Sequence, residues 1–402
     1  MARTIAPAQA ASRSGLLTVC LCCLVAIIEG FDLQSAGVAA PRLVPAFRLT
    51  PAQLGLFFSL GTFGLLVGAA IGGRVSDRFG RKRTLLGSIA FFGAMSILTG
   101  LAQSFEMLLA ARLLTGAGLG GALPNLIALV SENPAERRGS AVAVLYAGLP
   151  TGGALAAIVT LIDRDPANWS GIFLIGGLAP LVILPVVWAW LPDSRTLGAR
   201  GTGAVQGVGR ALFGEGRGVT TALLWTGFFL GLLVLYLLLN WLPSLMISRG
   251  LTRADASWVQ LAFNVGGALG SVGTGLLMDR WGRLPATVFV FGISIAALVL
   301  IAVVPAELVL MLIAGFCVGG TISGSQTVLY TLASSCYPTA VRGTGVGAAV
   351  SAGRLGSAAG PLLAGLLIGA GQSNVQVLVS LIPILGVSGI AAAMLGRRIR
   401  SA

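Results

Sequence analysis

Four charged residues stand inside otherwise apolar stretches of this 402-residue chain and could carry chemistry. Glu29 and Asp32 are three residues apart, so on a helix they share one face. Two carboxylates this close in a low dielectric cannot both be ionised at low cost, and at least one is expected to hold a proton near neutral pH. The alternative is that they only anchor the end of an apolar helix at a membrane interface.

The other two are Arg112 and Arg354. A guanidinium is always charged and offers a planar fork of donors that suits a carboxylate. We expect Arg112 at a depth similar to that of Asp32, so an ion pair between them is possible; the alternative is that Arg112 only holds helices together. The apolar run around Arg354 contains no acid. An anionic substrate is therefore the simplest partner to expect for Arg354. The alternative is that Arg354 bonds backbone carbonyls of other helices.

The elements that position these residues are membrane spans. The chain is 56% hydrophobic and 10% charged, where a soluble domain averages about 25% charged residues. A span needs ~20 mostly apolar residues, and an ionisable residue within one is a functional hypothesis by default. Twelve runs qualify, which predicts an all-α integral membrane protein: 16–39, 52–75, 83–103, 106–131, 139–162, 170–191, 219–245, 255–278, 284–304, 306–333, 343–369 and 375–396.

The chain is internally duplicated. Gly73, Asp77, Arg78, Gly80 and Arg81 follow one another with a spacing that returns 202 residues later, at Gly275, Asp279, Arg280, Gly282 and Arg283. A second motif returns 204 residues later, from Pro134, Arg138 and Gly139 to Pro338, Arg342 and Gly343. Because each half holds an even number of spans, both halves should insert the same way round, related by an axis along the membrane normal.

The predicted domains are an N-terminal six-helix half (1–191), a glycine-rich flexible cytoplasmic linker (192–218) and a C-terminal six-helix half (219–402). Most of the 26 Lys and Arg fall in tails and loops on one side, which is the positive-inside pattern and predicts that both termini are cytoplasmic. The net charge of +13 is thereby explained without nucleic acid. The first run is too long for a signal peptide. With no histidine and five scattered cysteines, neither a metal site nor a disulfide framework is expected.

These features resemble the major facilitator superfamily, whose loop 2–3 signature is similar to the run from Gly73 to Arg83. Within it, Glu29-Gly30-Phe31-Asp32 resembles the acidic pair of the aromatic acid:proton symporters, although Asp is commoner there than Glu29. The runs from Glu29 to Gln34 and from Gly116 to Glu132 resemble the 3-(3-hydroxyphenyl)propionate transporters. Further similar segments are Arg112 with Gly116 and Gly118, Leu123-Pro124-Asn125, Asn240-Trp241-Leu242-Pro243, and Gly353-Arg354-Leu355-Gly356 before Gly360-Pro361.

The resemblance implies a secondary transporter that works by alternating access and carries a small aromatic acid with protons through the bacterial inner membrane. No cofactor is implied, and a monomer is expected. The expected proton-coupling residues are Glu29, Asp32, Arg112 and Glu132. Arg354 is expected to bind the substrate carboxylate, with Asn125, Tyr236, Asn240, Gln326 and Tyr330 bonding ring hydroxyls and Phe228, Phe229 and Trp241 stacking on the ring. For each aromatic residue, simple packing is the alternative.

The repeated loop motifs are expected to form a gate. Neighbouring arginines and a helix N-terminus can hold Asp77 and Asp279, and arginines can bridge the halves when the cytoplasmic side is closed. The expected members are Asp77, Arg78, Arg81, Arg138, Asp279, Arg280, Arg283 and Arg342, with Glu132 completing the network. The alternative is that these charges only set the topology.

Three functions compete. A proton-coupled importer of a small aromatic carboxylate, of the hydroxyphenylpropionate or hydroxybenzoate type, is favoured. A proton-antiporting exporter of small organic or drug-like molecules comes next, because Gly148-Leu-Pro150-Thr-Gly152-Gly153 partly resembles the exporters' glycine–proline motif. A non-transporting membrane sensor is third. An enzyme is not expected, since the chain has no histidine and no nucleophile–base pairing.

Overall fold

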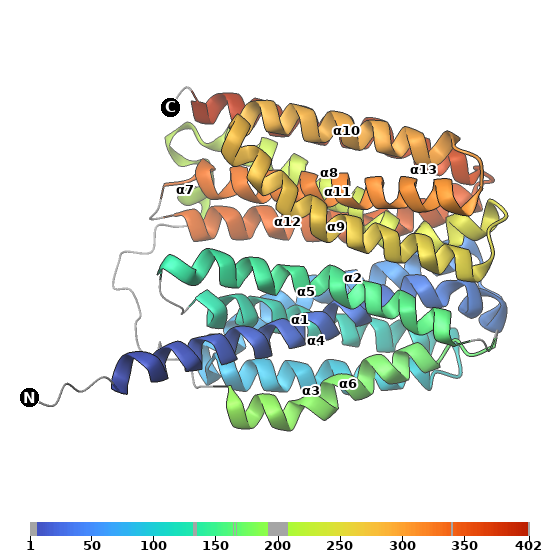
Figure 1. The fold of residues 1–402 in the computed structure, drawn as a ribbon, viewed down its shortest axis with the longest axis horizontal. Coiled ribbons are helices and arrows are strands. Elements are labelled where there is room, and N and C mark those ends of the chain that lie inside the picture. The colour runs from blue at the N-terminus through green and yellow to red at the C-terminus, as the bar shows by residue number, and fades with distance from the viewer. Residues whose placement is uncertain are drawn as a thin grey trace, which may run out of the picture. The chain divides into compact units, whose positions relative to one another are not determined.

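The fold is all-α, with twelve helices long and apolar enough to span a membrane and no strand among the described residues (Figure 1). The structure is a computed structural model that describes residues 6–131, 135–163, 165, 167–191, 208–338 and 341–400. Side chains are described from 15 to 130 and from 144 to 398, within those ranges.

Each predicted span coincides with one long helix. They are α1 (Ala6–Phe47), α2 (Pro51–Phe79), α3 (Arg81–Gly100), α4 (Phe105–Ser131), α5 (Ala135–Ile162), α6 (Gly171–Trp190), α8 (Gly218–Ser248), α9 (Arg253–Trp281), α10 (Arg283–Val303), α11 (Leu308–Cys336), α12 (Arg342–Gly369) and α13 (Asn374–Arg400). The largest difference from prediction is α1, which continues to Phe47 through Pro41 and Pro45. Proline is tolerated in membrane helices when neighbours satisfy the freed backbone groups.

The described part of the predicted linker is ordered by short-range bonds. It contains the short helix α7 (Val208–Phe213) and a 3₁₀ turn (Gly214–Gly216). The Arg217 guanidinium donates to the Ala211 carbonyl at 3.1 Å, and the Thr221 hydroxyl donates to the Leu212 carbonyl at 2.6 Å. The glycine-rich composition of the predicted linker therefore did not indicate this helical turn, which is hydrogen-bonded to the start of α8.

Contacts divide the chain into two compact units. Unit 1 comprises residues 1–35, 63–156 and 168–200, and unit 2 comprises residues 36–62, 157–167 and 201–402. Unit 2 thus contains the predicted second half together with the Phe47 end of α1, the Pro51 end of α2 and the Ile162 end of α5. The predicted division at 192–218 remains a prediction.

Close helix pairing in unit 1 depends on glycine. On α2, a Cβ atom added at Gly64 or Gly68 would overlap the carbonyl oxygen of Leu113 or Ala117 on α4. On α5, a Cβ added at Gly152 would overlap the Ile27 carbonyl of α1. Glycines let backbones approach in lipid, where no hydrophobic force drives helices together. Gly116 and Gly120 of α4 likewise lie against α2.

Unit 2 repeats these contacts at corresponding positions. Gly266 and Gly270 of α9 meet the carbonyl oxygens of Phe316 and Gly320 on α11, and Gly356 of α12 meets that of Phe229 on α8. Relative to the contacts in unit 1, these partners are displaced by 202 to 204 residues. The duplication is therefore present in the packing as well as in the loop motifs.

The repeated loop motif makes the same turn in both copies. One residue, Gly80, joins α2 to α3 with φ 88°, and one residue, Gly282, joins α9 to α10 with φ 79°. A positive φ is open to glycine at little cost and costly for most other residues. This conformation accounts for the glycine that each motif carries at that point.

The glycine contacts predict a stability difference between matched pairs of variants. Gly68→Ala and Gly270→Ala should each lower the melting temperature in detergent, because overpacking costs about 1–3 kcal/mol. Gly73→Ala and Gly275→Ala are the controls, since an added Cβ there meets nothing within 4 Å. The controls should leave the melting temperature unchanged or raise it, because alanine favours helix over glycine by about 1 kcal/mol. Equal losses in both pairs would contradict the packing account.

Candidate functional site

A buried ion pair lies in unit 1. The Asp32 carboxylate on α1 is fully buried, and its Oδ2 lies 3.2 Å from Nη1 of Arg112 on α4. Its Oδ1 accepts a hydrogen bond of 2.6 Å from the Ser96 hydroxyl on α3. The Arg112 guanidinium also lies over the Phe173 ring of α6, 5.6 Å from the centroid. The predicted pairing of Asp32 with Arg112 is present, and it joins four helices.

The other predicted proton-coupling residues are placed in part. Glu29 lies one turn before Asp32 on α1 and is only 1% exposed, and this burial does not favour the alternative in which the two carboxylates only anchor a helix end at an interface. Glu132 lies outside the described residues. The roles of all four residues in proton transfer remain predictions.

Arg354 lies among aromatic rings in unit 2. Its Nη1 donates to the Tyr236 hydroxyl of α8 at 2.7 Å, and the guanidinium lies 5.9 Å from the centroid of that ring. Tyr330 of α11 lies close enough to interact electrostatically with both. The Tyr330 ring meets Phe228 edge-on, with centroids 5.0 Å apart. A half-buried cation is thus set beside three aromatic side chains from α8 and α11.

Gln326 stands one turn from Tyr330 on α11. Its side chain is 7% exposed, and neither amide atom has a hydrogen-bond partner among the described residues. Its Nε2 lies over Gly231 of α8, where an added Cβ would come within 2.9 Å. Buried amide groups that lack partners are uncommon and costly, typically by about 1–3 kcal/mol for each group. This amide can therefore accept a partner that the described residues do not supply.

Two other predicted substrate residues, Asn125 and Asn240, make bonds within the protein. The Asn125 amide nitrogen donates to Gly121 at 2.8 Å, and its oxygen accepts from Ser76 at 2.6 Å. Asn240 donates to the Tyr236 carbonyl at 2.8 Å. These bonds use part of each amide's capacity, and the expected ligand roles of Asn125 and Asn240 remain predictions.

Trp241 lies in a different environment from Arg354. Its indole N–H donates to the Pro361 carbonyl at 2.9 Å, and its ring meets Phe58 edge-on at 5.6 Å. It also lines a cavity of about 350 Å³ with Pro41, Pro45 and Leu54. These contacts join the Phe47 end of α1 and the Pro51 end of α2 to α8 and α12 within unit 2.

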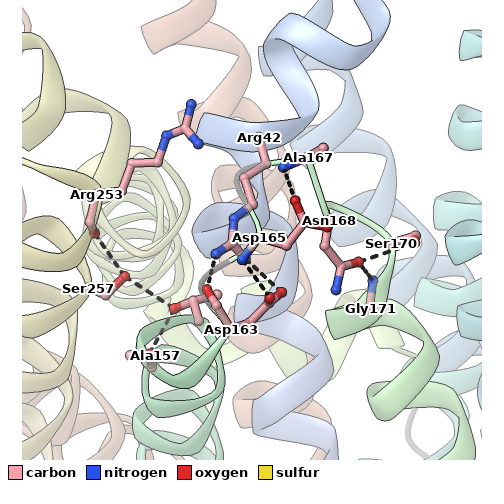
Figure 2. A network of polar contacts seen from close by, with 11 residues as sticks. Arg42, Ala157, Asp163, Asp165, Ala167, Asn168, Ser170, Gly171, Arg253 and Ser257 are labelled. Carbon is pink, nitrogen blue, oxygen red and sulfur yellow. Dashed lines mark hydrogen bonds and ion pairs between the residues drawn. The ribbon is translucent and has the colours of Figure 1, made fainter.

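A polar network that the sequence analysis missed lies near this cavity (Figure 2). The Arg42 guanidinium of α1 pairs with the Asp163 carboxylate beyond α5 at 3.2 Å and also donates to the Asp163 carbonyl. Beside it, the Thr160 hydroxyl bonds Ser257 of α9 at 3.1 Å. Opposite charges at the ends of two predicted spans were the available signal, but sequence alone does not show which helix ends are neighbours.

The predicted gate residues lie at the ends of helices. Asp77, Arg78, Asp279, Arg280 and Arg283 are exposed, and Asp77 and Asp279 make no ion pair within the part of the chain that the structure describes. Arg81 of α3 reaches the Ala128 carbonyl at 3.5 Å. Arg342 begins α12, and the side chain of Arg138 lies outside the described residues. Their gating role is not decided by this arrangement.

The comparison with protein families decides the identity of the fold. The family model described as Major Facilitator Superfamily matches residues 22–361 and, in a second match, residues 224–400. The chain belongs to the major facilitator superfamily.

Relatives within this superfamily are transporters of aromatic acids. The chain is 43% identical over 396 residues to the 3-(3-hydroxyphenyl)propionate transporter of Escherichia coli (strain K12), covering 98% of this chain and 97% of that one. It is 32% identical to the gallate transporter of Pseudomonas putida, with 94% and 90% covered. It is also 32% identical to a 4-hydroxybenzoate transporter of Pseudomonas putida, with 93% and 91% covered.

Solved structures show the same superfamily fold at lower identity. A crystal structure of a D-xylose–proton symporter has a TM-score of 0.77 at 19% identity, covering 96% of this chain and 97% of that one. A bacterial homologue of the human lysosomal transporter Spinster also has a TM-score of 0.77, at 17% identity, with 96% and 98% covered. At these identities the likeness extends to the fold alone.

Proposed function

We propose that this chain is a proton-coupled importer of a small aromatic carboxylate. The observation that carries the proposal is the position of Arg354, where a cation, three aromatic side chains and an unpartnered amide occur together in the middle of membrane helices. The names of three relatives, which are transporters of hydroxylated aromatic acids, support the same class of substrate. The proposed location is the bacterial inner membrane, with both termini in the cytoplasm.

Arg354 is the proposed anchor for the substrate carboxylate. A guanidinium binds a carboxylate through two parallel hydrogen bonds, and in this structure Arg354 donates to a neutral phenol, Tyr236. A carboxylate can replace the Tyr236 hydroxyl as the acceptor of this hydrogen bond. The displaced phenol carries no charge that would then lack a partner. The rings of Phe228, Tyr236 and Tyr330 provide faces and edges for an aromatic ring beside the anchor.

Gln326 is the proposed partner of a ring hydroxyl. A hydroxyl both donates and accepts, so one group can satisfy the amide oxygen and the amide nitrogen. Gln326 lies beside Gly231, and Arg354 bonds to Tyr236, five residues further along α8. This separation is roughly 7.5 Å along a helix axis at 1.5 Å per residue, enough for one ring with a short carboxylate arm.

Asp32 is the proposed proton carrier. Its carboxylate is also the ion-pair partner of Arg112, so a proton and the Arg112 guanidinium compete for it. Moving an anion inward against a negative-inside potential costs ~2.3 kcal/mol per charge per 100 mV, and more than one proton per substrate reverses that cost. With no histidine in the chain, a carboxylate must carry the proton. Protonation of Asp32 would remove the charge that faces Arg112 at 3.2 Å, and breaking a buried pair is strongly unfavourable, so proton binding favours rearrangement of this four-helix junction.

The loop motifs are proposed to stabilise a second conformational state. Asp77 and Asp279 are exposed here, so any ion pairs that they make with motif arginines would form in another arrangement of the transporter. Exporter activity has little support from the glycine–proline motif. Gly148 and Gly152 pack α5 on α1, and Gly356 packs α12 on α8 in the same way, so packing accounts for these glycines.

Proteoliposome uptake tests the function and the role of Asp32 together. With acid outside, the parent should accumulate 3-(3-hydroxyphenyl)propionate, and a protonophore should abolish accumulation. Asp32→Asn mimics the protonated form, so accumulation should disappear while exchange of labelled for unlabelled substrate continues. Glu106→Gln, which neutralises an exposed carboxylate on α4, is the matched control and should accumulate substrate normally.

The outcomes of this assay are separable. Absence of any aromatic acid flux in the parent would exclude the proposed function. Accumulation by Asp32→Asn equal to that of the parent would place the proton site elsewhere, with Glu29 and Glu132 the next carboxylates to test. Substrate efflux in exchange for protons, without uptake, would indicate the exporter.

Arg354 variants test the anion site by equilibrium binding in detergent. Arg354→Ala should weaken binding by about 10–100-fold, the equivalent of the 1.5–3 kcal/mol of a hydrogen bond to a charged group. Arg354→Lys should restore only part of this affinity, because an ammonium lacks the two-pronged geometry. The parent should also reject the neutral amide of the same acid. If the parent binds acid and amide equally, the anchor is wrongly assigned.

A comparison of two substrates tests Gln326. The parent should prefer 3-(3-hydroxyphenyl)propionate to 3-phenylpropionate by about tenfold or more, because the unsubstituted acid leaves the amide without a partner. Gln326→Leu should remove this preference while retaining affinity for 3-phenylpropionate. Asn264→Leu, which alters a buried amide on α9 that bonds the Gln260 carbonyl, should affect both acids alike. An unchanged preference in Gln326→Leu would exclude Gln326 as the hydroxyl partner and leave the anion site untouched.

A further inference from the structure

An apolar groove of about 690 Å³ runs between α2, α3 and α4 in unit 1. Its walls include Phe63 and Ile71 of α2, Phe91 of α3 and Leu114 of α4, which are 42%, 54%, 41% and 40% exposed. All four lie on helices that are long and apolar enough to span a membrane. The groove is therefore open to the hydrocarbon of a bilayer and is separate from the residues proposed to bind substrate.

The groove has the length of one membrane leaflet. Its lining follows α2 from Phe63 to Phe79, which is roughly 24 Å at 1.5 Å per residue. Half of a bilayer's hydrocarbon core is about 15 Å thick, so the groove covers one leaflet and reaches its headgroup region. Glycines without side chains lie along it, and at Gly87 of α3 an added Cβ would meet nothing within 4 Å. The space suits an extended acyl chain.

A basic side chain stands at the headgroup end. Arg83, on the first turn of α3, lines the groove and is exposed, and Lys82 precedes it. The duplicated motif does not explain this pair. At the corresponding positions of the second copy, Leu284 and Pro285 follow Arg283, although that copy keeps the aspartate, the arginines and the glycine turn. Lys82 and Arg83 therefore have no basic counterpart in the second copy, and Arg83 lines the groove.

We propose that this groove binds one anionic phospholipid, with an acyl chain along α2 and the phosphate at Arg83 and Lys82. Arginine binds phosphate through paired hydrogen bonds, and basic residues at a membrane surface attract anionic headgroups. The glycines that line the groove accept the acyl chain of a lipid whatever its headgroup. The basic pair supplies the preference for a negatively charged headgroup.

Native mass spectrometry of the full-length protein tests both parts separately. Phosphatidylglycerol and phosphatidylethanolamine with identical chains are titrated, and their apparent dissociation constants are compared. The parent should bind phosphatidylglycerol at least about fivefold more tightly, the factor that corresponds to one basic residue at about 1 kcal/mol. Lys82→Gln/Arg83→Gln should bring the two constants together. Gly87→Phe places a ring in the groove from a position where an added Cβ would meet nothing within 4 Å, so it should weaken both lipids and keep their ratio.

Arg210→Gln is the matched control, since Arg210 is an exposed basic residue on α7, outside the groove. It should leave the preference of the parent unchanged. Three results would overturn the proposal: no headgroup preference in the parent, an equal loss of preference in Arg210→Gln and in the double variant, or unaltered binding of both lipids in Gly87→Phe. Melting temperatures of the variants, measured without added lipid, verify that each is folded.

Discussion

Contact between helix backbones is the constraint on which the rest of this structure depends. In lipid, apolar side chains gain little by leaving one apolar surface for another, so helices associate where small residues permit dense packing. Gly64, Gly68 and Gly152 supply these contacts in unit 1, and Gly266, Gly270 and Gly356 supply them in unit 2. The functional side chains project from helices whose separation and rotation these contacts fix.

Three deep charges are held in two different ways by this packing. Asp32 and Arg112 form an internal pair, completed by the Ser96 hydroxyl, that neutralises both charges inside unit 1. Arg354 instead bonds a neutral phenol and lies among aromatic rings. Breaking a buried pair is strongly unfavourable, whereas exchanging one hydrogen-bond acceptor for another is less so. The first arrangement suits a switch that responds to a proton, and the second suits a ligand that arrives and leaves.

Sequence patterns predicted the helices well because span length and apolar composition are imposed by the bilayer. The repeat and the intramembrane charges were equally visible, and similar depth made a pair between Asp32 and Arg112 possible, which the structure contains. Contacts that depend on helix rotation were not predictable. The bond from the Trp241 indole N–H to the Pro361 carbonyl was not foreseen, and stacking of Trp241 on a substrate ring remains a prediction. The Arg42–Asp163 pair required knowledge of which helix ends are neighbours, and α7 was hidden by glycine-rich composition.

The single-residue turn at Gly80 has a consequence for how the protein is made. Because only Gly80 separates Phe79 from Arg81, α2 and α3 form one helical hairpin whose tip carries Arg81, Lys82 and Arg83. Carrying three such charges through hydrocarbon is costly, so this tip resists transfer across the bilayer. The turn at Gly282 is equally short, but Leu284 and Pro285 follow Arg283, so that tip carries fewer charges. The first tip is therefore the more strongly fixed of the two during membrane insertion.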